Sequence, residues 1–122
     1  MAKNILFAED DEDLRAILIH LLPTAGYRIQ SAADGQQALE MLESGRFDLL
    51  IVDLAMPKVD GWTVIREFRK RSENQKVPVI ALSAHDFGPD QAAAFQAGCD
   101  QFLAKPFDPY ELLKKIKLLL GE

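Results

Sequence analysis

Residues 48–61 read DLLIVDLAMPKVDG, and this stretch decides the fold. The apolar residues 49–52 run without interruption into the carboxylate of Asp53. A strand that is buried on both faces reads as a continuous apolar run, as in parallel sheets that helices cover on both sides. The segment therefore predicts a buried parallel strand that delivers Asp53 to the carboxyl end of the sheet.

Three more short apolar runs end in polar side chains. Residues 5–8 lead into Glu9 and Asp10, residues 79–82 into Ser83, and residues 102–104 into Lys105. In open α/β sheets, ligands bind outside the carboxyl ends of the strands. We therefore expect these polar side chains to gather with Asp53 at one edge of the sheet.

The segments between the apolar runs have the marks of helices. Apolar residues recur at helical spacing in residues 14–22, which predicts a helix that Pro23 and Gly26 end. The later helical segments begin at residues suited to a first turn, namely Asp34, Asp60, Pro89 and Asp108 with Pro109. Residues 27–32 alternate between apolar and polar side chains, which predicts a strand with one wetter face.

Five strands that alternate with five helices predict an α/β fold, because right-handed crossovers place helices on both faces of a parallel sheet. A wetter second strand suits an edge, and this favours the flavodoxin-like doubly wound order 2-1-3-4-5. That order places Glu9 and Asp10 beside Asp53. The 122 residues contain no repeat or linker, so we expect one domain, 1–122.

The composition argues against several classes of partner. The 14 basic and 19 acidic side chains give a net charge of −5, which disfavours nucleic acid and anionic membranes as partners. The chain lacks the run of about 18 apolar residues that a membrane span needs. The single cysteine, Cys99, cannot form an internal disulfide, and this favours a cytoplasmic location.

Three carboxylates at one sheet edge repel one another unless they share a hard cation. Mg²⁺ is the expected cofactor, because it takes oxygen ligands and is often held by one or two carboxylates and a phosphate. Asp53 could then attack phosphorus as a carboxylate nucleophile. Lys105 would neutralise one phosphoryl oxygen, and the Ser83 hydroxyl would donate to another.

Each of these residues also has a plainer interpretation. The acids in residues 9–13 suit the start of a helix, Asp53 could cap the next segment, and Lys105 could be an ordinary solvated lysine. The coincidence of these residue types at four strand ends favours the chemical interpretation.

Together the motifs resemble the receiver domain of bacterial-type two-component response regulators, over essentially the whole chain. Glu9 and Asp10 resemble the family's magnesium pocket, and residues 48–61 resemble its phosphoacceptor segment. Ser83 with Ala84 is similar to the family's switch pair, and residues 97–107 are similar to its aromatic and lysine motif.

The resemblance implies a role for each site residue. It makes Asp53 the phosphoacceptor, Lys105 and Ser83 phosphoryl contacts, and Phe102 the switch aromatic. The implied magnesium ligands are Glu9, Asp10, Asp53 and the backbone carbonyl of Ala55. The Lys105–Pro106 peptide bond is expected to be cis, as in relatives.

The resemblance also implies a function. A histidine kinase or histidine phosphotransfer protein would donate a phosphoryl group to Asp53, and the chain would assist only its own phosphorylation and dephosphorylation. The surface of the fourth helix, fifth strand and fifth helix would then change and control a downstream effector protein or effector domain.

Two other functions stay open. A receiver-shaped module could dock to partners without being phosphorylated. A magnesium-dependent phosphatase is disfavoured, since such enzymes usually carry a second aspartate two positions after the nucleophile, where this chain has Ala55. A nucleotide or flavin site is weaker still, because the acids in residues 9–13 would repel phosphate.

Overall fold

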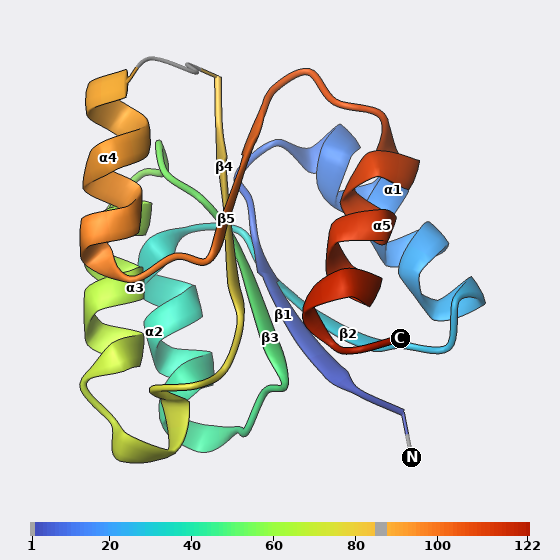
Figure 1. Ribbon diagram of the computed structural model, residues 1–122, viewed down its shortest axis with the longest axis horizontal. Helices are drawn as coiled ribbons and strands as arrows, with labels where there is room; N and C mark the ends of the chain where they lie inside the picture. The colour runs from blue at the N-terminus through green and yellow to red at the C-terminus, as the bar shows by residue number, and fades with distance from the viewer. Residues whose placement is uncertain (1, 85–87) are drawn as a thin grey trace.

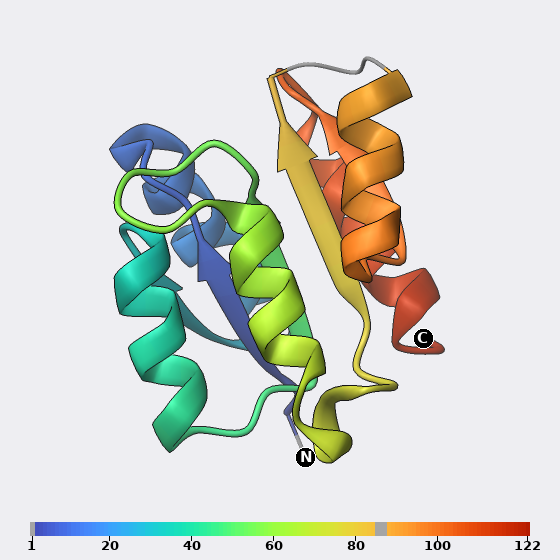
Figure 2. The ribbon, with the colours of Figure 1, turned by 90° about the vertical axis from the view of Figure 1, so that its left-hand side faces the viewer.

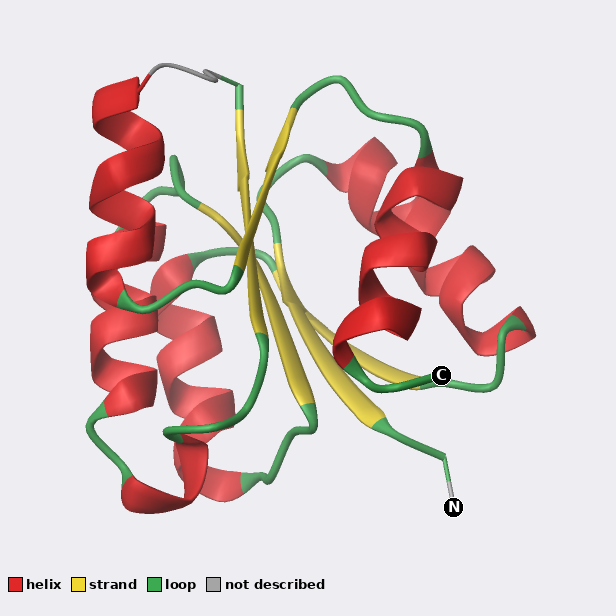
Figure 3. Cartoon of the chain, in the orientation of Figure 1, coloured by secondary structure: helices red, strands yellow, loops and turns green. Residues whose placement is uncertain are grey.

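Strands and helices alternate along the residues that the computed structural model describes, 2–84 and 88–122 (Figure 3). The strands are β1 (Asn4–Ala8), β2 (Arg28–Ala32), β3 (Leu49–Asp53), β4 (Val79–Ser83) and β5 (Gln101–Ala104). The α-helices are α1 (Glu12–Thr24), α2 (Gly35–Ser44), α3 (Gly61–Arg69), α4 (Gly88–Ala97) and α5 (Pro109–Leu119), with a 3₁₀ turn η1 (Ser72–Asn74) before β4. The predicted α/β class is confirmed.

The strands form one parallel sheet in the order β2-β1-β3-β4-β5. This is the predicted flavodoxin-like order 2-1-3-4-5. β1 and β3 pair along their length up to Ala8 opposite Val52. The residues that follow this last pair, Glu9 and Asp53, therefore leave neighbouring strands at the same edge.

Helices cover both faces of the sheet: α1 and α5 lie on one side, and α2, α3 and α4 lie on the other (Figure 1). Each face has its own apolar core, because successive residues of a strand point to opposite sides. Leu50 and Val52 of β3 pack toward α2, α3 and α4, whereas Leu49 and Ile51 pack toward α1 and α5. Within the described ranges, no helix is long and apolar enough to cross a membrane.

The predicted helix starts are confirmed at three aspartates. Asp34 accepts a hydrogen bond from the Gln37 N–H, Asp60 from the Thr63 N–H, and Asp108 from the Tyr110 N–H. These bonds satisfy donors that have no partner inside the helix.

The first predicted helix is confirmed, and it buries fewer residues than its apolar repeat contains. Pro23 lies in the last turn of α1, which ends at Thr24, and Gly26 follows the C-cap residue Ala25 with φ of 95°. Ile17 belongs to the apolar repeat but is 49% exposed. The helix buries Leu18 and Leu22 instead, because its contact with the sheet is narrower than the apolar stripe in the sequence.

Cys99 is buried two residues after the end of α4, and this leads to a prediction about its reactivity. Burial, with a smaller contribution from Asp100, raises the pKa of the Cys99 thiol to about 12. Because the thiolate is the reactive form, we expect the native protein to resist a disulfide reagent near neutral pH and the urea-unfolded protein to react at once. Rapid labelling of the native chain would contradict this placement.

Candidate metal and phosphoryl site

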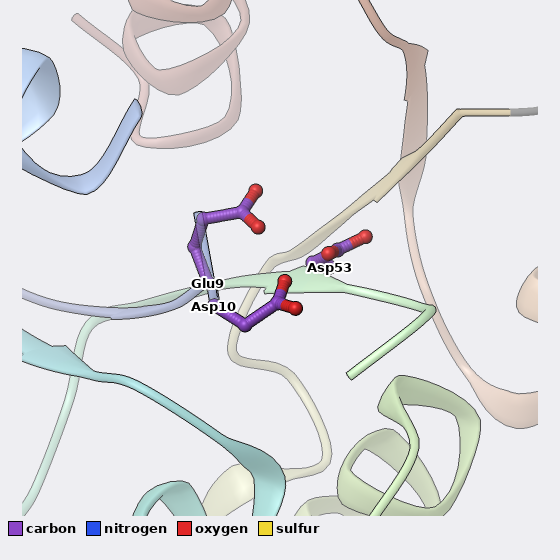
Figure 4. Close-up of side chains that lie close together, drawn as sticks. All are labelled: Glu9, Asp10 and Asp53. Atoms are coloured by element: carbon purple, nitrogen blue, oxygen red, sulfur yellow. The ribbon is translucent and has the colours of Figure 1, made fainter. Parts of the chain in front are cut away.

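Three acidic side chains meet at the carboxyl edge of the sheet. Glu9 follows β1, Asp53 ends β3, and Asp10 comes next to Glu9. One carboxylate oxygen from each lies within 4.8 Å of one from each of the others. Figure 4 shows the three side chains projecting into the same space. The predicted grouping of Glu9, Asp10 and Asp53 is therefore present in the structure.

The acidic residues after β1 have different roles in the structure. Asp11 is the N-cap of α1, since its side chain accepts hydrogen bonds from the Asp13 and Leu14 N–H groups. Glu9 is fully buried, and its carbonyl accepts a hydrogen bond from Arg15 Nη1 at 2.8 Å. The capping interpretation thus holds for Asp11, whereas Glu9 is turned into the site.

Lys105 lies between the two buried carboxylates. Its Nζ is 2.6 Å from Glu9 Oε1 and 3.2 Å from Asp53 Oδ2. The Lys105 N–H donates to the Ser83 carbonyl at 2.7 Å, and this hydrogen bond fixes the backbone at Lys105. The Lys105–Pro106 peptide bond is cis, as expected. The one ammonium group does not balance the two buried carboxylates and the neighbouring Asp10.

The pKa values of the Glu9, Asp53 and Lys105 side chains are shifted in this site. Burial raises the pKa of Glu9 to about 7, although the hydrogen bond from Lys105 opposes the shift. Burial also raises the pKa of Asp53. Burial alone would lower the pKa of Lys105, but the carboxylates of Glu9 and Asp53 outweigh it and raise the pKa. A hard divalent cation fits a site where, among the described residues, three carboxylates surround the single ammonium group of Lys105.

The raised pKa of Glu9 predicts how the stability of the metal-free protein depends on pH. The folded state holds this proton up to about pH 7, whereas the unfolded state releases it near the ordinary value of 4.5. The free energy of unfolding should therefore fall as the pH rises between these values, by on the order of a few kcal/mol.

Urea unfolding with a chelator present, from about pH 5 to about pH 8, measures this dependence. Glu9→Gln removes the titrating group, so its free energy of unfolding should change less over the same range. If the mutant and the wild-type curves were parallel, Glu9 would not be the group responsible.

The other predicted site residues lie at or near the same edge. Ser83 is buried at the end of β4, and Ala55 is exposed in the loop after β3, where its N–H donates to Asp53 Oδ1 at 3.4 Å. Phe102 lies within β5 opposite Ala81, and its half-buried ring packs against the core beneath α2, α3 and α4. Phe102 is thus part of the core beside the site and not part of the carboxylate cluster.

The sequence analysis assigned no role in the site to two buried glycines, Gly35 and Gly61. Each follows a helix-capping aspartate, Asp34 or Asp60, and each is buried. The repeated Asp-Gly pair at two helix starts is a signal that the sequence offers. The sequence does not show which backbone atoms approach each glycine in the folded chain.

The family model of the response regulator receiver domain matches residues 5–117. The chain belongs to this family. Receiver domains are signalling domains of two-component systems, and response regulators interact with histidine kinases and effectors. The resemblance of the motifs to this family is confirmed.

Relatives and solved structures agree with the family assignment. The response regulator MprA of Mycobacterium ulcerans is 38% identical over 120 residues, which are 98% of this chain and 51% of that protein. This receiver domain thus spans about half the length of the curated relatives it matches first. The chemotaxis protein CheY4 of Vibrio cholerae has a TM-score of 0.93 and 30% identity, over 98% of this chain and 100% of the other.

One solved relative contains a metal ion. The receiver domain of the sensor histidine kinase PA1611 from Pseudomonas aeruginosa PAO1 was solved with a magnesium ion coordinated in its active-site cleft. It is 34% identical to this receiver domain with a TM-score of 0.90, and each chain is covered over 100% of its length.

Proposed function

We propose that this receiver domain is a phosphorylation-dependent signalling switch and that Asp53 accepts the phosphoryl group. The observation that carries the proposal is the buried Asp53 carboxylate. It lies 3.2 Å from the Lys105 ammonium and is grouped with Glu9 and Asp10 at the carboxyl edge of the sheet. A structural ion pair would need only one carboxylate for one lysine. The surplus of acids is what a site for a divalent cation requires.

We propose that Glu9, Asp10, Asp53 and the backbone carbonyl of Ala55 hold Mg²⁺. When bound, Mg²⁺ would supply the positive charge that lets an anionic phosphoryl donor approach these carboxylates. Among the residues that the structure describes, the donor set consists of oxygen atoms, and this supports the choice of metal.

The transfer step uses the nucleophilic oxygen of Asp53. This oxygen forms a bond to phosphorus while the bond from phosphorus to the donor's imidazole nitrogen breaks, and the imidazole keeps the electron pair. Lys105 is placed to move its ammonium from Asp53 to a phosphoryl oxygen. The Ser83 hydroxyl would donate to another oxygen, so the reaction needs positioned charge and no general base.

The output proposed for this step is a change of surface. Movement of Ser83 toward the phosphoryl group would open space at the end of β4, and the ring of Phe102 in the neighbouring strand would enter it. The surface formed by α4, β5 and α5 would then bind a downstream effector protein or effector domain differently.

The proposed phosphoryl donor is a histidine kinase or a histidine phosphotransfer protein. Because such kinases use ATP, the proposal places this domain in the cytoplasm. Neither nucleic acid nor membrane is a proposed partner of the domain, given its net charge of −5.

Phosphotransfer from candidate donors tests the proposal. A radiolabelled phosphohistidine donor should lose its label to this chain when Mg²⁺ is added, and a chelator should prevent the transfer. If no kinase, phosphotransfer protein or small donor such as acetyl phosphate labelled the chain, the module would act by docking alone. Turnover of a phosphate ester would instead favour a phosphatase, which Ala55 disfavours because it supplies no second carboxylate.

A further inference from the structure

The loop between β3 and α3, residues 54–60, folds back tightly on the strand that precedes it. The Gly61 N–H donates to the Leu54 carbonyl at 2.9 Å. A Cβ on Gly61 would lie 2.4 Å from the Asp53 carbonyl oxygen and 2.7 Å from Leu54 Cα. Both neighbours are backbone atoms, so no side chain could rotate away. The loop can adopt this conformation only if residue 61 has no Cβ, which means glycine.

The loop also contacts α2, which contributes no residue to the carboxylate cluster. A Cβ on Gly35, the first residue of α2, would lie 1.8 Å from the Val59 carbonyl oxygen and 2.6 Å from its carbonyl carbon. Figure 2 shows the loop passing beside the N-terminal end of this helix. The backbone of the loop thus rests directly on the backbone of α2.

Further interactions hold the same part of the loop. Lys58 has a φ of 71°, a conformation that side chains other than glycine rarely adopt, and its Nζ lies 3.5 Å from Asp34 Oδ2. The Val59 N–H donates to the Pro57 carbonyl at 2.9 Å. A backbone held in a sparsely populated conformation persists only where its surroundings fix it. Here the start of α2 provides those surroundings.

We propose that Gly35 and Gly61 are positioning residues for the metal site, because their close backbone contacts fix the position of the loop that carries the Ala55 carbonyl. Gly61 acts on the segment directly after Asp53, and Gly35 acts through Val59. The inference rests on the proposed function, since it concerns the ligand set assigned there. It adds that the start of α2 is coupled to metal binding through backbone contact.

Substitution of either glycine tests the inference by calorimetric titration with Mg²⁺ alone. Gly35→Ala and Gly61→Ala should retain the helical circular dichroism of the wild type but bind Mg²⁺ roughly 10-fold or more weakly, the range seen when a support of a metal ligand is lost. Gly45→Ala is the matched control at the other end of α2. Its Cβ would approach no atom closer than 3.3 Å, so Mg²⁺ affinity should stay unchanged.

Hydrogen exchange of the wild-type protein gives a second test that does not depend on the mutants folding. Mg²⁺ should slow exchange of the Gly61 and Val59 N–H groups and also of the Gln37 N–H, which is bonded to Asp34 in α2. The Asn74 N–H in η1, which donates to the Arg71 carbonyl, should not respond.

The outcomes separate this inference from the function on which it rests. A wild-type chain that does not bind Mg²⁺ refutes the proposed metal site. If the wild type binds Mg²⁺ but folded Gly35→Ala binds it equally well, or if Gln37 does not respond while the loop does, α2 does not position the site.

Discussion

Replacing Asp53 by asparagine should abolish the mass increase of one phosphoryl group that acetyl phosphate and Mg²⁺ produce on the wild-type chain. Asparagine has nearly the same shape, but its amide oxygen carries no charge and is a far weaker nucleophile than a carboxylate. The loss should be complete within the detection limit of intact-protein mass spectrometry. Among the residues that the structure describes, Asp53 is the buried carboxylate at the end of the central strand β3, with one oxygen 3.2 Å from Lys105 Nζ.

Asp108→Asn is the matched control for this experiment. Asp108 caps α5 through the Tyr110 N–H, and asparagine caps helices about as well as aspartate. This variant should gain the phosphoryl mass as the wild type does. Persistence of the adduct in Asp53→Asn would move the phosphoacceptor to another residue and remove the basis of the proposed mechanism.

Asp53→Asn should also melt at a higher temperature than the wild type when no metal is present. Burial raises the pKa of Asp53, which means that the folded state disfavours its charge. Lys105 would keep its 2.6 Å contact with Glu9 after the substitution, so no ammonium group is left without a partner. Thermal unfolding with a chelator measures this gain. A lower melting temperature would show that the Asp53–Lys105 pair stabilises the metal-free fold.

Magnesium should stabilise the wild-type receiver domain strongly. A ligand that binds only the folded state adds about 2.7 kcal/mol at 100 times its dissociation constant. For a chain of this length that corresponds to an increase in melting temperature of roughly 10 °C. The physical reason is the surplus of negative charge at Glu9, Asp10 and Asp53, which one lysine does not balance.

Sodium chloride at matched ionic strength is the control for the magnesium effect, because screening alone acts through any salt. Asp53→Asn should lose most of the response, since it removes one of the carboxylates. An equal increase in melting temperature with either salt would mean that these acids do not share a cation.

The sequence predicted the sheet and the position of the carboxylates well, for a physical reason. A strand buried on both faces must be apolar throughout, so residues 49–52 marked a central strand and placed Asp53 at its end. Only a few strand orders are common in doubly wound sheets, and the flavodoxin-like order places Glu9 beside Asp53. Local pattern was sufficient here because the burial of a strand depends on its own residues.

Local pattern was insufficient where the outcome depends on tertiary fit. The apolar repeat did not reveal that Ile17 is exposed, since that depends on how α1 lies on the sheet. The helix-starting glycine Gly35 gave no hint that the Val59 carbonyl presses against it, because the two residues meet only in the folded chain. Likewise, the pairing of Lys105 with Glu9 as well as Asp53 required the distances between three strand ends.

Peptide mapping of the chain after treatment with acetyl phosphate tests the central claim most directly. Reduction of the acyl phosphate with borohydride fixes the modified position, and tandem mass spectrometry then identifies it. The account predicts modification at Asp53, present with Mg²⁺ and absent with a chelator. Modification at another residue, or equal modification of Asp53 without a divalent cation, would contradict it.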